Sequence, residues 1–209
     1  MCDKNTIRCK KTHDKTPIKS CCKKHLLELL NYVTLTLEKN NIKYWLDYGT
    51  LLGATRNEKM IPWDDDCDIS ILMDDEEKAK KILQNNDQGY IVYWHPDYPK
   101  INTFFGVRYS EVNNLHIDIF AWKEKNGFMH RRNYLDNGPI SPDAKKGKHF
   151  PKEFIQNLTK IKLEDKEYWA PDNPIEFCKF RYGKAWNIPL TVEEWNTKIN
   201  NKINKIYNF

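Results

Sequence analysis

Apolar side chains between residues 21 and 39 recur at the spacing of one face of an α-helix. An apolar stripe of this kind predicts an amphipathic helix that packs against a core. Ser20 stands just before the pattern and is the expected N-cap, and Asn40-Asn41 marks the expected end. The stripe consists of Leu26, Leu30, Val33 and Leu37.

Residues 66–73 follow a different pattern, because apolar and polar side chains alternate one by one. Alternation predicts a β-strand, in which successive side chains point to opposite faces of a sheet. One face is expected to carry Asp66, Asp68 and Ser70 and so to bring two carboxylates together. The opposite face is expected to enter the core and carries Cys67, Ile69, Ile71 and Met73.

The rest of the chain also reads as a mixture of strands and helices, with no repeat or low-complexity linker. Asn126-Gly127 is typical of a hairpin turn, residues 136–151 look loop-like, and the C-terminal third is expected to be helical and aromatic. The prediction is one α/β (α+β) domain, a mixed sheet flanked by helices. Further strands are expected at Ile42–Asp47, Tyr90–Trp94, Thr103–Tyr109, Leu115–Lys123 and Phe128–Asn133, and helices at Leu51–Ala54 (capped by Thr50), 74–83, Ile175–Tyr182 and Val192–Ile206.

Composition supports a folded domain, since 209 residues with 40% apolar and 13% aromatic side chains can bury a sizeable core. The net charge of +5 is mild and no basic, aromatic-rich tract occurs, so nucleic acid is not an expected partner. No apolar run is long enough for a membrane-spanning helix, and residues 1–16 lack the apolar run of a signal peptide. The expected location is therefore cytoplasmic.

A second acidic strand carries His116 and Asp118 on one face. If it pairs beside the first, Asp118 joins Asp66 and Asp68 in a cluster of three carboxylates. Carboxylates bind Mg²⁺ or Mn²⁺, and two such ions can activate an attacking hydroxyl and stabilise a leaving phosphate oxygen. We therefore predict a Mg²⁺ (or Mn²⁺) site. The alternative, a solvated acidic loop, is the preferred interpretation for Asp65 alone.

A glycine turn at Gly49-Thr50 precedes the acidic strand. Glycine lets main-chain N–H groups approach a phosphate and the threonine adds a hydroxyl, so both residues are candidate substrate-binding residues. Arg56 follows at the end of the short helix, where its planar guanidinium could clamp a phosphate at two points. A surface salt bridge is the alternative for Arg56. Arg108, on the strand expected beside Asp118, is a second candidate for the clamp.

These motifs together resemble the LicD/fukutin family, which includes bacterial phosphorylcholine transferases, fukutin and fukutin-related protein. The resemblance spans about residues 26–189, nearly the whole chain. It is carried by YWLDYGTLLGATR at residues 44–56, IPWDDDCDI at residues 61–69, the strand Leu115–Phe120 and RYGKAW at residues 181–186.

The resemblance implies a nucleotidyltransferase-like fold over residues 26–209. It also implies transfer of a phospho-alcohol, such as phosphocholine or ribitol phosphate, from a CDP-activated donor to a glycan or sugar hydroxyl, with release of CMP. Carried over to this chain, Asp66 and Asp68 are Mg²⁺ ligands and Asp64 is an accessory ligand. Asp118 is the third carboxylate and the expected general base.

Cysteines are concentrated in an N-terminal segment, residues 1–25, which holds four of the six. In a reducing compartment, thiols or metal ligands are expected rather than disulfides, and four thiolates favour a structural Zn²⁺ site. Fukutin-related protein is similar in having a zinc-binding cysteine cluster before its catalytic domain. Free thiols are the alternative. The four residues are Cys2, Cys9, Cys21 and Cys22.

Two other functions stay open at the level of sequence. One is an NTP-dependent nucleotidyltransferase, which would release pyrophosphate instead of CMP. The other is a non-catalytic binding protein that retains the fold. The intact set of Asp66, Asp68 and Asp118 argues against a non-catalytic protein.

Overall fold

The computed structural model describes residues 3–7, 16–94, 104–131, 149–189 and 194. Within them, a mixed sheet has the strand order β1-β2-β5-β4-β3, and β6 and β7 extend it from β5. The pairing of β2 with β5 is parallel, whereas the other pairs are antiparallel. The strands are β1 (Tyr44–Leu46), β2 (Asp66–Leu72), β3 (Ile91–Trp94), β4 (Phe104–Arg108), β5 (His116–Lys125), β6 (Phe128–Arg131) and β7 (His149–Pro151).

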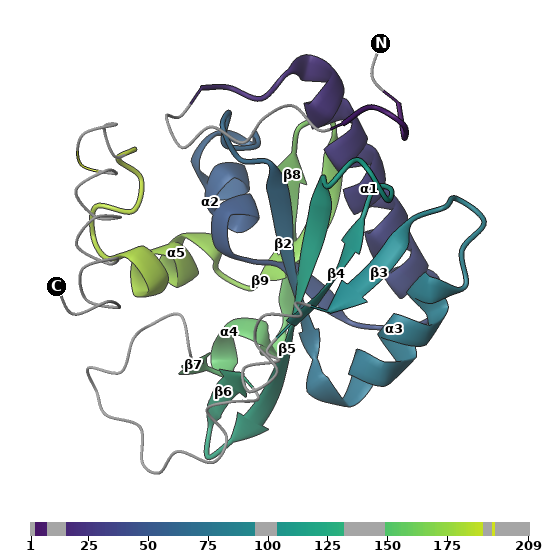
Figure 1. Cartoon of the computed structure of the whole chain (residues 1–209). Coiled ribbons are helices and arrows are strands. Elements are labelled where there is room, and N and C mark those ends of the chain that lie inside the picture. Colours follow the sequence, from purple (N-terminus) through teal and green to yellow (C-terminus); the bar gives the residue numbers. More distant parts are fainter. Residues whose placement is uncertain (1–2, 8–15, 95–103, 132–148, 190–193, 195–209) are drawn as a thin grey trace, which may run out of the picture.

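Helices flank this sheet, as the sequence predicts (Figure 1). Helices α1 and α3 lie to the right of β2 in this view, and α2 and α5 lie to its left. None of the described helices has the length and apolar character needed to cross a membrane. The helices are α1 (Ser20–Lys39), α2 (Tyr48–Asn57), α3 (Glu76–Gln84), α4 (Glu153–Gln156) and α5 (Pro174–Tyr182), and a 3₁₀ turn, η1 (Met73–Asp75), follows β2.

The core forms where the two predicted patterns meet. The apolar stripe of α1 is fully buried, and so are Cys67, Ile69 and Ile71 on one face of β2. Burial of a leucine-sized side chain contributes roughly 1.5–3 kcal/mol, so this contact is a large part of what holds the sheet to α1. Since the apolar face of β2 is committed to the core, its acidic residues must project from the opposite face.

The boundaries of two helices differ from the prediction. Helix α1 begins at Ser20 itself, and its N-cap is Lys19, which makes no capping side-chain bond. Helix α2 starts at Tyr48, upstream of the expected Thr50 cap, because the Asp47 side chain accepts the Tyr48 N–H at 2.8 Å and caps the helix. Thr50 therefore lies inside the first turn.

The prediction of an all-helical C-terminal third is wrong for residues 158–171. There, β8 (Leu158–Leu163) and β9 (Lys166–Pro171) form an antiparallel hairpin. Its turn places Glu164 at φ 58°, a left-handed conformation that glycine or asparagine usually supplies. The usual hairpin signal is thus absent from the sequence. The end of the expected loop at residues 136–151 is also a strand, β7, which pairs with β6.

Some predictions fall on residues outside the described ranges. These are the helix Val192–Ile206, apart from Glu194, residues 136–148 of the expected loop, and the last two residues of the strand expected at Phe128–Asn133. The helix predicted at Ile175–Tyr182 is confirmed as α5, which Gly183 ends at φ 87°. The predicted α/β fold class is confirmed.

Candidate active site

Parallel pairing of β2 with β5 assembles the acidic cluster at the start of both strands. Asp66 is the register partner of His116, and Asp68 is the partner of Asp118. Ligand atoms of Asp66, His116 and Asp118 all lie within 4.8 Å of one another, and among the described residues this is the one such group. Two carboxylates and an imidazole at this spacing are a suitable ligand set for a divalent cation.

His116 presents a defined ring nitrogen to the cluster. Its Nδ1 lies 2.9 Å from the carbonyl oxygen of Asn114, an acceptor, so Nδ1 carries the proton and donates it there. In the neutral ring, Nε2 then bears a lone pair, 3.9 Å from Asp66 Oδ2 and 3.7 Å from Asp118 Oδ1. A carbonyl that fixes the tautomer of a histidine in this way is typical of metal-ligating imidazoles.

Asp68 lies behind this group and is held by the start of α2. The Gly49 N–H donates to Asp68 Oδ2 at 3.1 Å, and the Asp68 N–H donates to the Thr50 hydroxyl at 2.8 Å. Burial, with the charges of Asp66 and Asp118 adding to it, raises the pKa of Asp68 well above its usual range. A bound cation would favour the charged carboxylate of Asp68 and so oppose this rise in its pKa.

Gly49 has a steric role beside its hydrogen bond. A Cβ at this position would lie 2.8 Å from Asp64 Oδ2 and 3.6 Å from Asp68 Oδ2. Glycine therefore allows the carboxylate of Asp64 to approach the start of α2 and join the acidic side of the sheet. The two residues predicted to face a phosphate, Gly49 and Thr50, contact Asp68 directly.

Tyr93 is a site residue that the sequence analysis did not single out. Its hydroxyl donates to Asp118 Oδ1 at 2.9 Å. The ring lies across Gly106, where a Cβ would come within 2.6 Å of it, so only a glycine on β4 permits this path. Burial and the charge of Asp118 raise the pKa of Tyr93, which keeps it a hydrogen-bond donor. A glycine inside a strand is a signal of such close approach.

A buried ion pair stabilises the elements that carry the acidic cluster. Arg181 Nη2 lies 2.7 Å from Asp47 Oδ2, with exposed side-chain fractions of only 2% and 0%. Asp47 Oδ2 also accepts the Ser70 hydroxyl at 2.7 Å, and that hydroxyl accepts the Trp122 Nε1–H at 2.9 Å. The guanidinium of Arg181 is 4.4 Å from the Tyr48 ring centroid. This network ties α5 to β2, β5 and the start of α2.

The two arginines predicted to clamp a phosphate occupy different surroundings. Arg56 Nε donates to the Trp186 carbonyl at 2.8 Å, and its Nη2 also contacts that carbonyl, so this guanidinium fastens the segment after α5. Arg108 pairs with His116 across β4 and β5, and its guanidinium lies 4.2 Å from the Tyr93 ring centroid. Arg108 is thus the arginine next to the cluster.

The cysteine prediction receives no support from the described residues. Cys22 is a buried free thiol of α1. Cys21 is disulfide-bonded, contrary to the expectation of thiols or metal ligands. Cys2 and Cys9 lie outside the described ranges.

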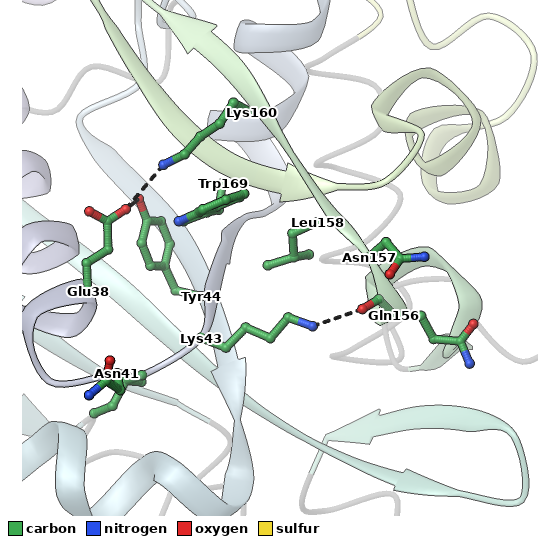
Figure 2. A pocket seen from close by; sticks show the side chains of 10 residues that line it. Glu38, Asn41, Lys43, Tyr44, Gln156, Asn157, Leu158, Lys160 and Trp169 are labelled. Atoms are coloured by element: carbon green, nitrogen blue, oxygen red, sulfur yellow. Dashed lines mark hydrogen bonds and ion pairs between the residues drawn. The ribbon is translucent and has the colours of Figure 1, made fainter.

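A separate hollow of about 730 Å³ lies near the C-terminal end of α1, against β1 and β8 (Figure 2). Its charged side chains are engaged with the protein. Lys43 donates to the Ile155 and Gln156 carbonyls at 3.0 and 3.1 Å, and Lys160 contacts Glu38 at 3.3 Å. None of the acidic cluster lines this hollow.

Known proteins share this domain. The family described as "LicD/FKTN/FKRP, nucleotidyltransferase domain" matches residues 41–173. The chain is 31% identical over 196 residues to "Ribitol 5-phosphate transferase FKRP" of Homo sapiens. This alignment covers 87% of this chain and 38% of the human protein. It is 40% identical over 52 residues to "Lipopolysaccharide cholinephosphotransferase LicD" of Haemophilus influenzae, 25% of this chain and 20% of that one. The chain thus spans about two fifths of the length of the human relative.

A solved structure agrees on the fold. The lincosamide antibiotic adenylyltransferase LnuA, in a lincomycin-bound crystal structure, superposes with a TM-score of 0.50 at 15% identity, over 88% of this chain and 98% of that one. At this identity the likeness concerns the fold alone, and it confirms the predicted nucleotidyltransferase-like architecture. With the family match over residues 41–173 and the similarity to the human relative, the chain belongs to the LicD/fukutin family.

Proposed function

We propose that the chain is a metal-dependent transferase that moves a phospho-alcohol from a CDP-activated donor to a hydroxyl of a glycan or sugar, with release of CMP. Relatives named as ribitol 5-phosphate and choline phosphate transferases support this class of reaction. The observation that carries the proposal is the cluster of Asp66, His116 and Asp118, with Asp68 beside it.

The donor set of the cluster fits a divalent cation. Asp66, Asp118 and His116 Nε2 would hold it, with Asp68 and Asp64 close by. Carboxylates suit Mg²⁺ and Mn²⁺, and the imidazole favours Mn²⁺ of the two. When bound, the cation would supply positive charge to the phosphates of the donor and lower the pKa of a bound hydroxyl.

The residues of the chain would act on the proton and on the phosphates. Asp118 accepts the proton of the acceptor hydroxyl, while the Tyr93 hydrogen bond holds its carboxylate in place. The acceptor oxygen forms a bond to the distal phosphorus of the donor, and the bond from that phosphorus to the bridging oxygen breaks. CMP leaves with the bonding electrons. Arg108 would contact the donor phosphates, and its position beside His116 on the next strand supports this role.

The test is a screen of CDP-ribitol, CDP-choline and CDP-glycerol for CMP release, with candidate glycan acceptors and with Mg²⁺, Mn²⁺ or a chelator. We expect release only with metal, and a loss of at least about a hundredfold in Asp66→Asn and Asp118→Asn, since each removes a ligand or the base. Asp74→Asn is the matched control, because Asp74 is an exposed carboxylate outside the cluster.

Three results would decide against the proposal. Metal-independent release is one, and unchanged release in Asp66→Asn or Asp118→Asn is another. Pyrophosphate release from an NTP, without CMP release from any CDP-alcohol, would instead identify a nucleotidyltransferase.

A further inference from the structure

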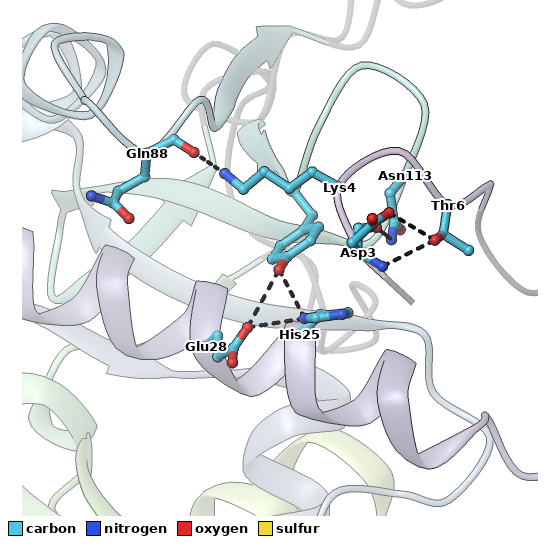
Figure 3. A network of polar contacts seen from close by, with 8 residues as sticks. Asp3, Lys4, Thr6, His25, Glu28, Gln88 and Asn113 are labelled. Atoms are coloured by element: carbon cyan, nitrogen blue, oxygen red, sulfur yellow. Dashed lines mark hydrogen bonds and ion pairs between the residues drawn. The ribbon is translucent and has the colours of Figure 1, made fainter. Parts of the chain in front are cut away.

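The segment Asp3–Thr6 carries a lysine, Lys4, whose ammonium group contacts the Gln88 carbonyl (Figure 3). This ammonium group also lies against two tyrosine rings. Lys4 Nζ is 4.0 Å from the centroid of the Tyr90 ring and 5.3 Å from that of Tyr109, and it donates to the Gln88 carbonyl. Ring faces attract a cation through their negative quadrupole. The contact is thus a cation site that the chain itself occupies.

A nearby carboxylate, that of Glu28, adds negative charge to the surroundings of this cation site. Glu28 Oε2 lies 3.4 Å from the Tyr109 hydroxyl and 2.9 Å from His25 Nδ1, which itself lies 2.8 Å from that hydroxyl. Burial lowers the pKa of Lys4, and the charge of Glu28 opposes that effect. The charge of Glu28 therefore offsets part of the cost of burying the ammonium group of Lys4.

The backbone of the same segment is bonded to the turn between β4 and β5. The Ser110 hydroxyl donates to the Lys4 carbonyl at 2.5 Å, and Asn113 Nδ2 makes a longer contact of 3.5 Å with the Asp3 carbonyl. Ser110 and Asn113 are both buried. The segment itself is folded, since Asp3 Oδ1 accepts from the Asn5 N–H and the Thr6 hydroxyl, each at 2.9 Å.

This turn leads directly into the acidic cluster. The Ser110 hydroxyl also accepts the Asn113 N–H at 2.9 Å, and Asn113 Oδ1 accepts the Leu115 N–H at 3.3 Å. Between Asn113 and Leu115 lies Asn114, whose carbonyl holds the Nδ1–H of His116. The polar side chains that hold the Asp3–Thr6 segment are thus the ones that shape the turn before His116.

We propose that Asp3–Thr6 is a latch: Lys4 in its tyrosine site locks the turn at residues 110–114 and thereby positions His116 in the metal cluster. Lys4 is a positioning residue that acts through Ser110 and Asn113. The tyrosine site recognises an organic ammonium group, so free alkylammonium ions compete with Lys4 for it. The effect on metal binding rests on the proposed function, whereas the effect on the turn does not.

The experiment compares Lys4→Met, which keeps the apolar stem and removes the charge, with Lys4→Arg, which keeps a cation. Lys81→Met, at an exposed lysine of α3, is the matched control. Three quantities are measured in the whole chain: hydrogen exchange at the Asn113 and Leu115 amides, the ¹⁵N shifts of the His116 ring without metal, and the dissociation constant of Mn²⁺.

We expect Lys4→Met to speed exchange at both amides by about tenfold or more, to shift the His116 ring nitrogens and to weaken Mn²⁺ binding severalfold. Lys4→Arg should retain most of the wild-type behaviour. Tetramethylammonium chloride should speed exchange in the wild type more than NaCl at equal ionic strength, and should have no such effect in Lys4→Met.

The latch is overturned if Lys4→Met matches Lys81→Met in exchange and in ring shifts. It is also overturned if tetramethylammonium acts on Lys4→Met as it does on the wild type. If the wild type binds no Mn²⁺, the proposed function fails, and exchange and ring shifts alone decide on the latch.

Discussion

At the scale of single residues, the path of Tyr93 to the cluster depends on Gly106. Tyr93, Gly106 and Asp118 are register partners on three neighbouring strands, and the ring crosses the glycine to reach the carboxylate. Any larger residue at position 106 would collide with the ring, since even a Cβ comes within 2.6 Å. The tyrosine thus covers one side of the candidate base while its hydroxyl orients it.

Tyr93→Phe tests this arrangement. The variant keeps the ring over Gly106 and loses the hydrogen bond to Asp118, and a bond to a charged group is worth about 1.5–3 kcal/mol. We expect CMP release to fall about tenfold, with a small change in the free energy of unfolding. Tyr32→Phe, at a tyrosine outside the cluster, is the control in activity and urea-denaturation assays. Equal rates of CMP release in the two variants would show that the Tyr93 hydroxyl has no part in the reaction.

At the scale of elements, one ion pair fixes α5 to the side of the sheet that carries the acidic cluster. Arg181 and Asp47 are almost fully buried. Burial acts to lower the pKa of Arg181, but the charge of Asp47 and the neighbouring tyrosines together outweigh burial and raise this pKa. Arg181 therefore stays charged in the folded chain. Because Asp47 also caps α2, the pair links α5 to the turn that holds Asp68.

Arg181→Met should destabilise the chain by about 3–5 kcal/mol, because it leaves the buried Asp47 carboxylate without its partner. Adding Asp47→Asn to this variant removes the uncompensated charge and should recover part of the loss. Urea denaturation of the single and double variants measures both effects. A loss below about 1 kcal/mol in Arg181→Met would mean that the pair contributes little.

The β6–β7 pair is expected to make stability depend on pH. His130 and His149 are register partners with ring centroids 5.9 Å apart, and burial lowers the pKa of both below the model-peptide value of 6.5. The unfolded chain therefore binds protons first as pH falls.

Stability from this pair should be fully present above about pH 6.5 and should be lost as pH falls through the lower folded-state pKa values. Urea midpoints between pH 8 and pH 5 measure the effect. The double variant His130→Gln, His149→Gln should reduce the dependence of the urea midpoint on pH near pH 6. An unchanged pH dependence would mean that other groups cause it.

Strand assignments that follow a regular side-chain pattern were predictable from the sequence, whereas the positions of residues set by turns or by tertiary contacts were not. Alternation placed Asp66 with Asp68 on one face of β2 and His116 with Asp118 on one face of β5, because side-chain parity is local to a strand. The pairing of β2 with β5, which brings Asp118 to Asp66 and Asp68, came from the fold. The hairpin of β8 and β9 was missed because Glu164 replaces the usual turn glycine. Arg181 reaches Asp47 through a tertiary contact that no local pattern encodes, and the local signal of the Tyr93 contact is Gly106 inside β4.

At the scale of the whole molecule, the acidic residues come together only in the folded state. Asp64, Asp66, Asp68 and Asp118 converge only when the sheet is formed, and their mutual repulsion raises the pKa of Asp68 on top of the effect of burial. A cation that binds this cluster therefore binds the native chain and stabilises it by mass action.

Mn²⁺ at about a hundred times its dissociation constant should stabilise the chain by about 2.7 kcal/mol, seen as a higher melting temperature. Asp118→Asn should lose most of this increase, because it removes one of the three ligands. Asp74→Asn should keep it, as the exposed control. Equal melting shifts in both variants would place the metal elsewhere.

The parallel pairing of β2 with β5 has a consequence for how the chain folds. Its partners, such as Asp66 and His116, are about fifty positions apart in the sequence, and closing so long a loop is slow. The carboxylates gather only as this ladder closes, so charge repulsion opposes the same step that completes the sheet. We expect divalent cations to speed refolding or to slow unfolding. A molecule that holds metal here has already joined its two central strands, so metal occupancy is a readout of completed folding.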